Sequence, residues 1–185
     1  MNAGKRFEEN WKKSVPEYVY YHRLNDNASI FTNSNAKYSV HNPFDCMLFS
    51  NGALFCFELK STGMGYFTFE RSKEDEGKKM IHLWQIQGLD KASKYDGVYG
   101  GFLFNFRNDE IKTEATFYQS IDDFNRMINE LNKNSFKVVD LLKYNPIKIS
   151  SEKIRVNYRY DIEDLLGKIM LSDTISKINL EEVQG

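Results

Sequence analysis

The stretch that decides the fold reads Phe44-Asp45-Cys46-Met47-Leu48-Phe49-Ser50, then Asn51-Gly52, then Ala53-Leu54-Phe55-Cys56-Phe57-Glu58-Leu59-Lys60. Two apolar runs flank the Asn-Gly pair, which favours a two-residue type I′ turn because both residues tolerate a positive φ. The stretch therefore predicts a β-hairpin in which Ser50 faces Ala53. Counting outward from the turn, Asp45 lies opposite Glu58. Both runs are apolar on both faces, which is typical of strands inside a covered sheet.

Three charged side chains interrupt this apolar hairpin. Cβ atoms of opposed residues lie about 5 Å apart, so the carboxylates of Asp45 and Glu58 repel each other. Lys60 projects from the same face as Glu58, because side chains alternate along a strand. Oxygen ligands of this kind suit Mg²⁺ or Mn²⁺, with the Leu59 carbonyl as a further ligand. A water bound to the metal ion could act as the attacking nucleophile, and Lys60 would then orient or deprotonate this water. The plainer interpretation is a surface Glu58–Lys60 pair beside a solvated Asp45.

Composition sets the broad class of the protein. The chain has 185 residues, of which 41% are hydrophobic and 15% aromatic, so we expect one domain with its own core. The net charge of −1 means that an anionic partner would have to be bound by a local basic patch. We find no apolar run of membrane-spanning length and no signal-like N-terminus, and we expect a soluble, cytoplasmic protein.

Cysteine and histidine suggest no further site. Cys46 and Cys56 point to opposite faces of the predicted hairpin, which argues against a disulfide between them. The three histidines, His22, His41 and His82, lack the spacing of a zinc site.

The remaining pattern predicts an α/β fold with a central mixed sheet. We expect helices at residues 4–14, 80–95, 120–131, 136–143 and 161–171. Further strands are expected at residues 18–23, 66–69, 98–106, 116–118 and 154–158. Residues 24–42 read as a long loop, and residues 70–79 as a charged, exposed and mobile segment. We assign residues 1–185 to a single domain, with a core at about 2–131 and an extension at about 135–185.

Several motifs carry a resemblance to known nucleases. Asp45, twelve intervening residues and Glu58-Leu59-Lys60 resemble the PD-(D/E)xK nuclease superfamily, with Pro43 one residue further from the Asp than in the strict form. The segment from Asn2 to Glu8 resembles the Asn-x-Gly-x-x-x-Glu opening of RecU-type Holliday junction resolvases, also called penicillin-binding protein-related factor A. Residues 82–89 and 97–104 are similar to that family's next helix and strand. The resemblance covers about residues 2–131.

The resemblance implies a restriction-endonuclease-like core, with a central mixed β-sheet flanked by helices on both faces. It implies a Mg-dependent endodeoxyribonuclease that resolves Holliday junctions in DNA recombination and repair, as a homodimer. Asp45, Glu58 and Glu8 would hold Mg²⁺ or Mn²⁺, and Lys60 and Gln85 would complete the catalytic set. Without the family, Glu8 is an ordinary solvated residue of a first helical turn, and Glu9 is an equal candidate.

Candidate DNA contacts are basic residues in two segments. The set comprises Lys5, Arg6, Lys12 and Lys13 on the first helix, and Arg71, Lys73, Lys78 and Lys79 in the charged segment. The second segment also contains many acidic residues, which is typical of a solvated loop. Residues 24–42, where the resolvases carry a junction-entering stalk, have Lys37 as their only basic side chain, although phosphate binding relies on Lys and Arg.

Three other functions fit the same residues. A restriction- or repair-type nuclease would share the fold and the site. A glycoside hydrolase would use Asp45 and Glu58 as its carboxylate pair, but it would leave Lys60 without a role. A non-catalytic DNA-binding or interaction module would need none of the three charges.

Overall fold

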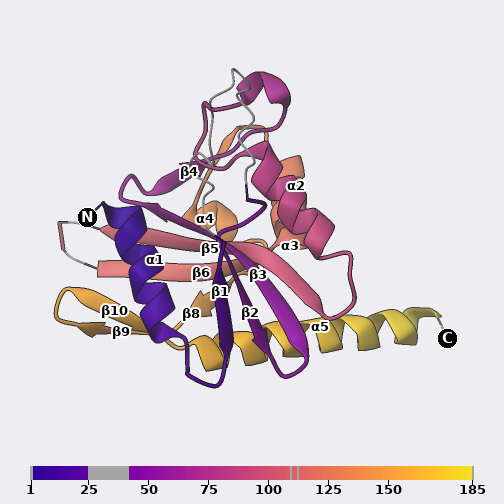
Figure 1. The fold of residues 1–185 in the computed structure, drawn as a ribbon. Helices are drawn as coiled ribbons and strands as arrows, with labels where there is room; N and C mark the ends of the chain where they lie inside the picture. Colours follow the sequence, from indigo (N-terminus) through magenta and orange to yellow (C-terminus); the bar gives the residue numbers. More distant parts are fainter. Residues whose placement is uncertain (1, 25–41, 109, 112, 185) are drawn as a thin grey trace, which may run out of the picture.

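A six-stranded mixed sheet with helices on both faces forms the centre of the protein (Figure 1). A computed structural model describes residues 2–24, 42–108, 110–111 and 113–184. In spatial order the strands are β1 (Tyr20–Arg23), β2 (Cys46–Ser50), β3 (Ala53–Thr62), β5 (Val98–Asn108), β6 (Thr113–Ser120) and β8 (Ile147–Ile149). Only the β3–β5 pairing of this sheet is parallel among the described residues. The predicted α/β class with a central mixed sheet is therefore confirmed.

The predicted hairpin forms, in the predicted register. Ser50 pairs with Ala53 and the ladder runs to Cys46 and Phe57, with positive φ angles of 51° at Asn51 and 78° at Gly52. Regular pairing stops one residue short of Asp45, whose N–H bonds to the Phe57 carbonyl at 3.0 Å. Asp45 thus lies outside the β2–β3 ladder. The predicted cross-strand pairing of Asp45 with Glu58 is therefore absent from this ladder.

Each face of the sheet has its own apolar cluster. Helices α1 (Ala3–Ser14) and α5 (Ile162–Gln184) contribute to one cluster, in which Trp11 meets Phe57 edge-on with ring centroids 5.8 Å apart. Helices α2 (Leu83–Ala92) and α3 (Ile121–Glu130) contribute to the other. Cys46 and Cys56 are buried free thiols in different clusters, which confirms that they point to opposite faces.

The shorter elements lie outside the main sheet. Strand β4 (Tyr66–Thr68) pairs with β7 (Ser135–Lys137), which leads into α4 (Val138–Leu141). A 3₁₀ turn at Lys73–Asp75 lies between β4 and α2. Strands β9 (Ser151–Ile154) and β10 (Asn157–Tyr160) form a separate hairpin. No helix among the described residues is both long and apolar enough to cross a membrane.

Several expected elements differ from the structure, among them the strand at 116–118, which extends over 113–120, and the helix at 136–143, which is shortened to 138–141 by β7. The residues expected to form one strand at 154–158 instead span the turn of the β9–β10 hairpin. The prediction was wrong because the alternation of apolar and polar residues continues across this turn. The sequence prediction missed β8 altogether. Helix α2 begins only at Leu83, since Ile81 forms a bridge with Phe69. Helix α5 continues to Gln184, beyond the predicted 161–171. Most of the predicted loop 24–42 lies outside the described residues.

Helix α2 packs closely against the segment that leads to Asp45. A Cβ atom on Gly88 would lie 2.6 Å from the Cβ and 2.7 Å from the carbonyl oxygen of Pro43. Gly167 in α5 is also helical, but a Cβ there would meet nothing within 4 Å. Of these two helical glycines, only Gly88 has a backbone approach so close that a side chain would not fit.

We expect Gly88→Ala to lower the free energy of unfolding by about 1–3 kcal/mol, since the added methyl overpacks the contact with Pro43. The matched Gly167→Ala should raise it by about 0.5–1 kcal/mol, because alanine favours a helix interior over glycine. Urea denaturation of both variants measures the difference. A stabilising Gly88→Ala would contradict the close approach of α2 to Pro43.

Candidate active site

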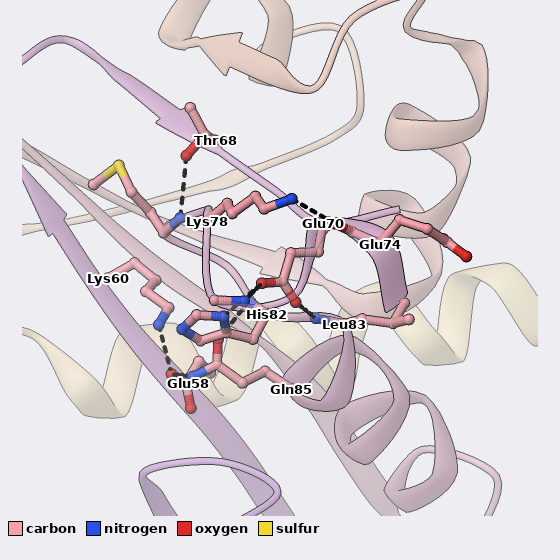
Figure 2. A network of polar contacts seen from close by, with 11 residues as sticks. Glu58, Lys60, Thr68, Glu70, Glu74, Lys78, His82, Leu83 and Gln85 are labelled. Carbon is pink, nitrogen blue, oxygen red and sulfur yellow. Dashed lines mark hydrogen bonds and ion pairs between the residues drawn. The ribbon is translucent and has the colours of Figure 1, made fainter. Parts of the chain in front are cut away.

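Glu58 lies at the centre of the candidate site. Its side chain projects from the middle strand β3 and is only 2% exposed. The Lys60 ammonium lies 3.0 Å from Glu58 Oε1, and the Gln85 amide of α2 donates a hydrogen bond to the same oxygen. Figure 2 shows both side chains directed at the Glu58 carboxylate. Three of the five predicted catalytic residues are therefore in direct contact.

Burial makes Glu58 an unusual acid. Desolvation raises its pKa from 4.5 to about 8, against the opposing effect of the Lys60 charge. The charges of Asp45 and Glu8 raise it further, so these carboxylates belong to the same electrostatic environment. Such a group is mostly protonated at neutral pH, and a cation bound beside it would favour the ionised form.

Asp45 is held against the strand that carries Glu58 and Lys60. Its Oδ2 atom accepts a hydrogen bond of 2.7 Å from the Leu59 N–H. The carboxylate thereby takes the place of a backbone acceptor where the β2–β3 ladder ends. Leu59 lies between Glu58 and Lys60 in the sequence, so this bond fixes the Asp45 carboxylate beside the other two charges.

Glu8 of α1 is close enough to raise the Glu58 pKa, and it has a partner that the sequence did not indicate. Arg23 of β1 lies 2.5 Å from its carboxylate. Among the residues that the structure describes, no three His, Cys, Asp or Glu side chains form a group arranged to hold a metal ion.

The donor chemistry at Asp45 and Glu58 nevertheless suits Mg²⁺. This ion often binds proteins through one or two carboxylates, and waters and substrate phosphates supply its other ligands. Burial raises the Glu58 pKa most, and the charges of Asp45 and Glu8 raise it further; a divalent cation would favour the ionised carboxylate against all three effects.

A second buried carboxylate, Glu70, was missed by the sequence prediction, which placed it in an exposed segment. It is 1% exposed and accepts hydrogen bonds from His82 Nδ1 at 2.9 Å, the Leu83 N–H at 2.8 Å and the Gly77 N–H at 2.7 Å. Burial alone would raise its pKa, but these hydrogen bonds lower it below the usual value. The charged neighbours of Glu70 in the sequence gave no signal of this role.

The Glu70 contacts connect with Glu58 through the first turn of α2. The His82 N–H donates to Gln85 Oε1 at 2.9 Å, while the other end of the same amide donates to Glu58. Figure 2 shows Glu70 and His82 next to Gln85 and Glu58. Gln85 is thus oriented from both ends, and the start of α2 is fixed by Glu70.

The predicted DNA contacts come from separate segments of the chain. Lys5, Lys12 and Lys13 lie along α1, whereas Lys73, Lys78 and Lys79 lie between β4 and α2. Lys78 donates to the Glu74 carbonyl at 2.8 Å, and Arg71 donates to the Leu131 carbonyl at 2.6 Å. Arg6 instead lines a pocket with basic residues of the C-terminal third of the chain.

The sequence of the chain is similar to that of a prophage protein. No family model matches it. It is 32% identical over 182 residues to the SPbeta prophage-derived uncharacterized protein YotM of Bacillus subtilis. This alignment covers 91% of this chain and 87% of YotM. It is also 30% identical over 107 residues to a tRNA dimethylallyltransferase of Caldanaerobacter subterraneus, which covers 57% of this chain but 31% of that enzyme. Because the first similarity spans most of both proteins, the chain belongs to the family of YotM.

Proposed function

We propose that the protein is a metal-dependent DNA endonuclease with a restriction-endonuclease-like core. The observation that carries the proposal is the buried Glu58, contacted by Lys60 and Gln85 and electrostatically coupled to Asp45 and Glu8. A buried carboxyl with an unusual pKa, next to an ammonium, destabilises a sheet and is typical of a functional site. Asp45, Glu58 and Lys60 also resemble the PD-(D/E)xK pattern, with Pro43 one residue further from the Asp than in the strict form.

Each side chain has a role in phosphodiester hydrolysis. Asp45 and Glu58 would hold Mg²⁺ or Mn²⁺, with the Leu59 carbonyl available at the same strand end. Such an ion lowers the pKa of a bound water and neutralises charge that develops on the phosphate. The Lys60 ammonium stabilises anionic charge or orients the water, and Gln85 keeps the Glu58 carboxylate in place.

The preferred DNA structure follows from the resemblance to RecU-type resolvases, so we propose Holliday junctions cut by a homodimer. Two active sites related by a two-fold axis cut two strands symmetrically. A restriction- or repair-type nuclease would use the same site on duplex DNA. The second relative is a tRNA dimethylallyltransferase, and a similarity over 31% of that enzyme does not extend its activity to the present chain.

We expect Glu58→Gln, Asp45→Asn and Lys60→Ala each to slow nicking of supercoiled plasmid at least about 100-fold in the presence of Mg²⁺ or Mn²⁺. The control Glu163→Gln removes an exposed carboxylate of α5 and should cut like the wild type. EDTA should abolish cutting by both active proteins. Wild-type activity in Glu58→Gln would falsify the nuclease proposal, whereas equal cutting of four-way junctions and linear duplex would remove only the junction preference.

The stability of the metal-free protein should depend on pH through Glu58. Its folded pKa of about 8 exceeds the usual 4.5, so the native state binds this proton more tightly than the unfolded state. The free energy of unfolding of the wild type should therefore fall, relative to Glu58→Gln, as pH rises from 5 to 8. Urea denaturation at several pH values measures this difference. A difference that does not change with pH would contradict the buried, protonated Glu58.

Glu70 should act as a positioning residue. In Glu70→Gln, one of the three hydrogen-bond donors loses its acceptor, and we expect a loss of about 1–3 kcal/mol in the free energy of unfolding. Because α2 then holds Gln85 less firmly, kcat for nicking should fall while the KM for DNA stays constant. Nicking kinetics at a temperature where both proteins are folded make the test. An unchanged kcat would limit Glu70 to a structural role.

A further inference from the structure

A basic pocket of about 310 Å³ lies apart from the Glu58 carboxylate. It is formed where α1, the β5–β6 pair and the β9–β10 hairpin meet, elements whose ends lie together at the left of Figure 1. Four cationic side chains line it: Arg6, Arg107, Lys153 and Arg155. Glu114 is the single carboxylate among its lining residues. The pocket therefore carries a formal charge of +3, from four positive groups and one negative, in a chain whose net charge is −1.

Arg107 joins this pocket to the strand of the candidate site. Its Nε atom donates a hydrogen bond of 3.0 Å to Ser61 Oγ, and Ser61 directly follows Lys60 in β3. Side chains alternate along a strand, so Lys60 and Ser61 project from opposite faces of the sheet. The pocket therefore lies near the C-terminal end of the strand that holds Glu58 and Lys60, on the opposite face of the sheet.

The carboxylate in the pocket is already engaged by the protein. Glu114 is the cross-strand neighbour of Arg107, and it accepts a hydrogen bond of 2.5 Å from the Tyr160 hydroxyl. Glu114 therefore offsets only a part of the positive charge in the pocket. The four cations themselves come from three separate parts of the chain.

The backbone at Arg155 provides an independent observation. Arg155 and Val156 form the two-residue turn between β9 and β10, and Arg155 has a φ of 59°. Glycine and asparagine adopt this left-handed conformation most easily, and a long cationic side chain gains nothing from it in folding. Residues kept in unfavourable backbone conformations cluster at ligand sites. Here the unfavourable residue is an exposed arginine on a basic pocket.

We propose that this pocket binds the phosphate backbone of duplex DNA near the C-terminal end of the strand that carries Glu58 and Lys60. The inference rests on the proposed function for the identity of the anion. Guanidinium groups match phosphate oxygens in a planar, two-pronged geometry, and three of the four cations are arginines. Cations spread over α1, β5 and a separate hairpin suit a repeating polyanion better than one small anion. Contacts of this type are independent of base sequence and weaken with salt.

The test compares two double variants in binding to a short, fluorescently labelled DNA duplex in EDTA, measured by anisotropy at several salt concentrations. Lys153→Ala/Arg155→Gly removes two charges from the pocket, and glycine accommodates the positive φ, so the fold is retained. The control Lys91→Ala/Lys94→Ala removes two exposed charges from the C-terminal end of α2 and the residues after it. A melting curve of each variant verifies folding.

We expect Lys153→Ala/Arg155→Gly to bind at least about tenfold more weakly than the wild type, with a salt slope less steep by about 2. The control should match the wild type in both, and Lys153→Arg/Arg155→Lys should keep tight binding. Wild-type affinity and slope in Lys153→Ala/Arg155→Gly would overturn the inference. So would inorganic phosphate that displaces the duplex at an equal concentration of phosphate groups, because the pocket would then be a site for single anions.

Plasmid nicking separates this inference from the proposed function. A wild-type protein that binds duplex through the pocket but cuts no DNA supports the pocket and removes the nuclease proposal. A wild-type protein that cuts DNA, with binding insensitive to Lys153 and Arg155, keeps the nuclease proposal and removes the pocket.

Discussion

The burial of Glu58 in the central strand is the constraint on which the rest of the site depends. A carboxylate removed from water is unfavourable unless it is protonated, paired or bound to a cation. This protein places an ammonium on the same strand and an amide on the facing helix against it. The position of α2 is in turn fixed by Gly88 at Pro43 and by Glu70 at its first turn. The fold around the site can thus be followed outward from one acidic group.

Two carboxyls near the first turn of α2, those of Glu58 and Glu70, have opposite pKa shifts. The Glu58 carboxyl has few donors relative to its burial, so its pKa rises to about 8. Glu70 is equally little exposed to solvent, but it receives three hydrogen bonds, and its pKa falls. The first suits a group whose charge is completed by a ligand, and the second suits a permanent structural anion. The exposed fraction does not distinguish the two carboxyls, whereas the hydrogen bonds that lower the pKa of Glu70 do.

The sequence was a good guide where local patterns determine structure. Asn51-Gly52 specified the hairpin register, and the Glu58-x-Lys60 spacing put two charges on one face. It was a poor guide where contacts join distant segments. Glu70 was indistinguishable from its solvated neighbours, because its donors lie 7 to 13 residues further along the chain. The sequence prediction missed the pocket of Arg6, Arg107 and Arg155 for the same reason, because its cations come from three distant parts of the chain. The hairpin turn at Arg155 lacked the Gly or Asn signal of a typical tight turn.

The bond from the Leu59 N–H to Asp45 Oδ2 has a consequence for ligand binding. A carboxylate at the end of a strand usually samples several rotamers, and a ligand that selects one of them must overcome that loss of freedom. Here the backbone of β3 has already selected the rotamer, because the Asp45 carboxylate accepts the Leu59 N–H where the β2–β3 ladder ends. The Asp45 carboxylate is therefore preorganised, and the entropy of ordering it is lost in folding rather than in each binding event.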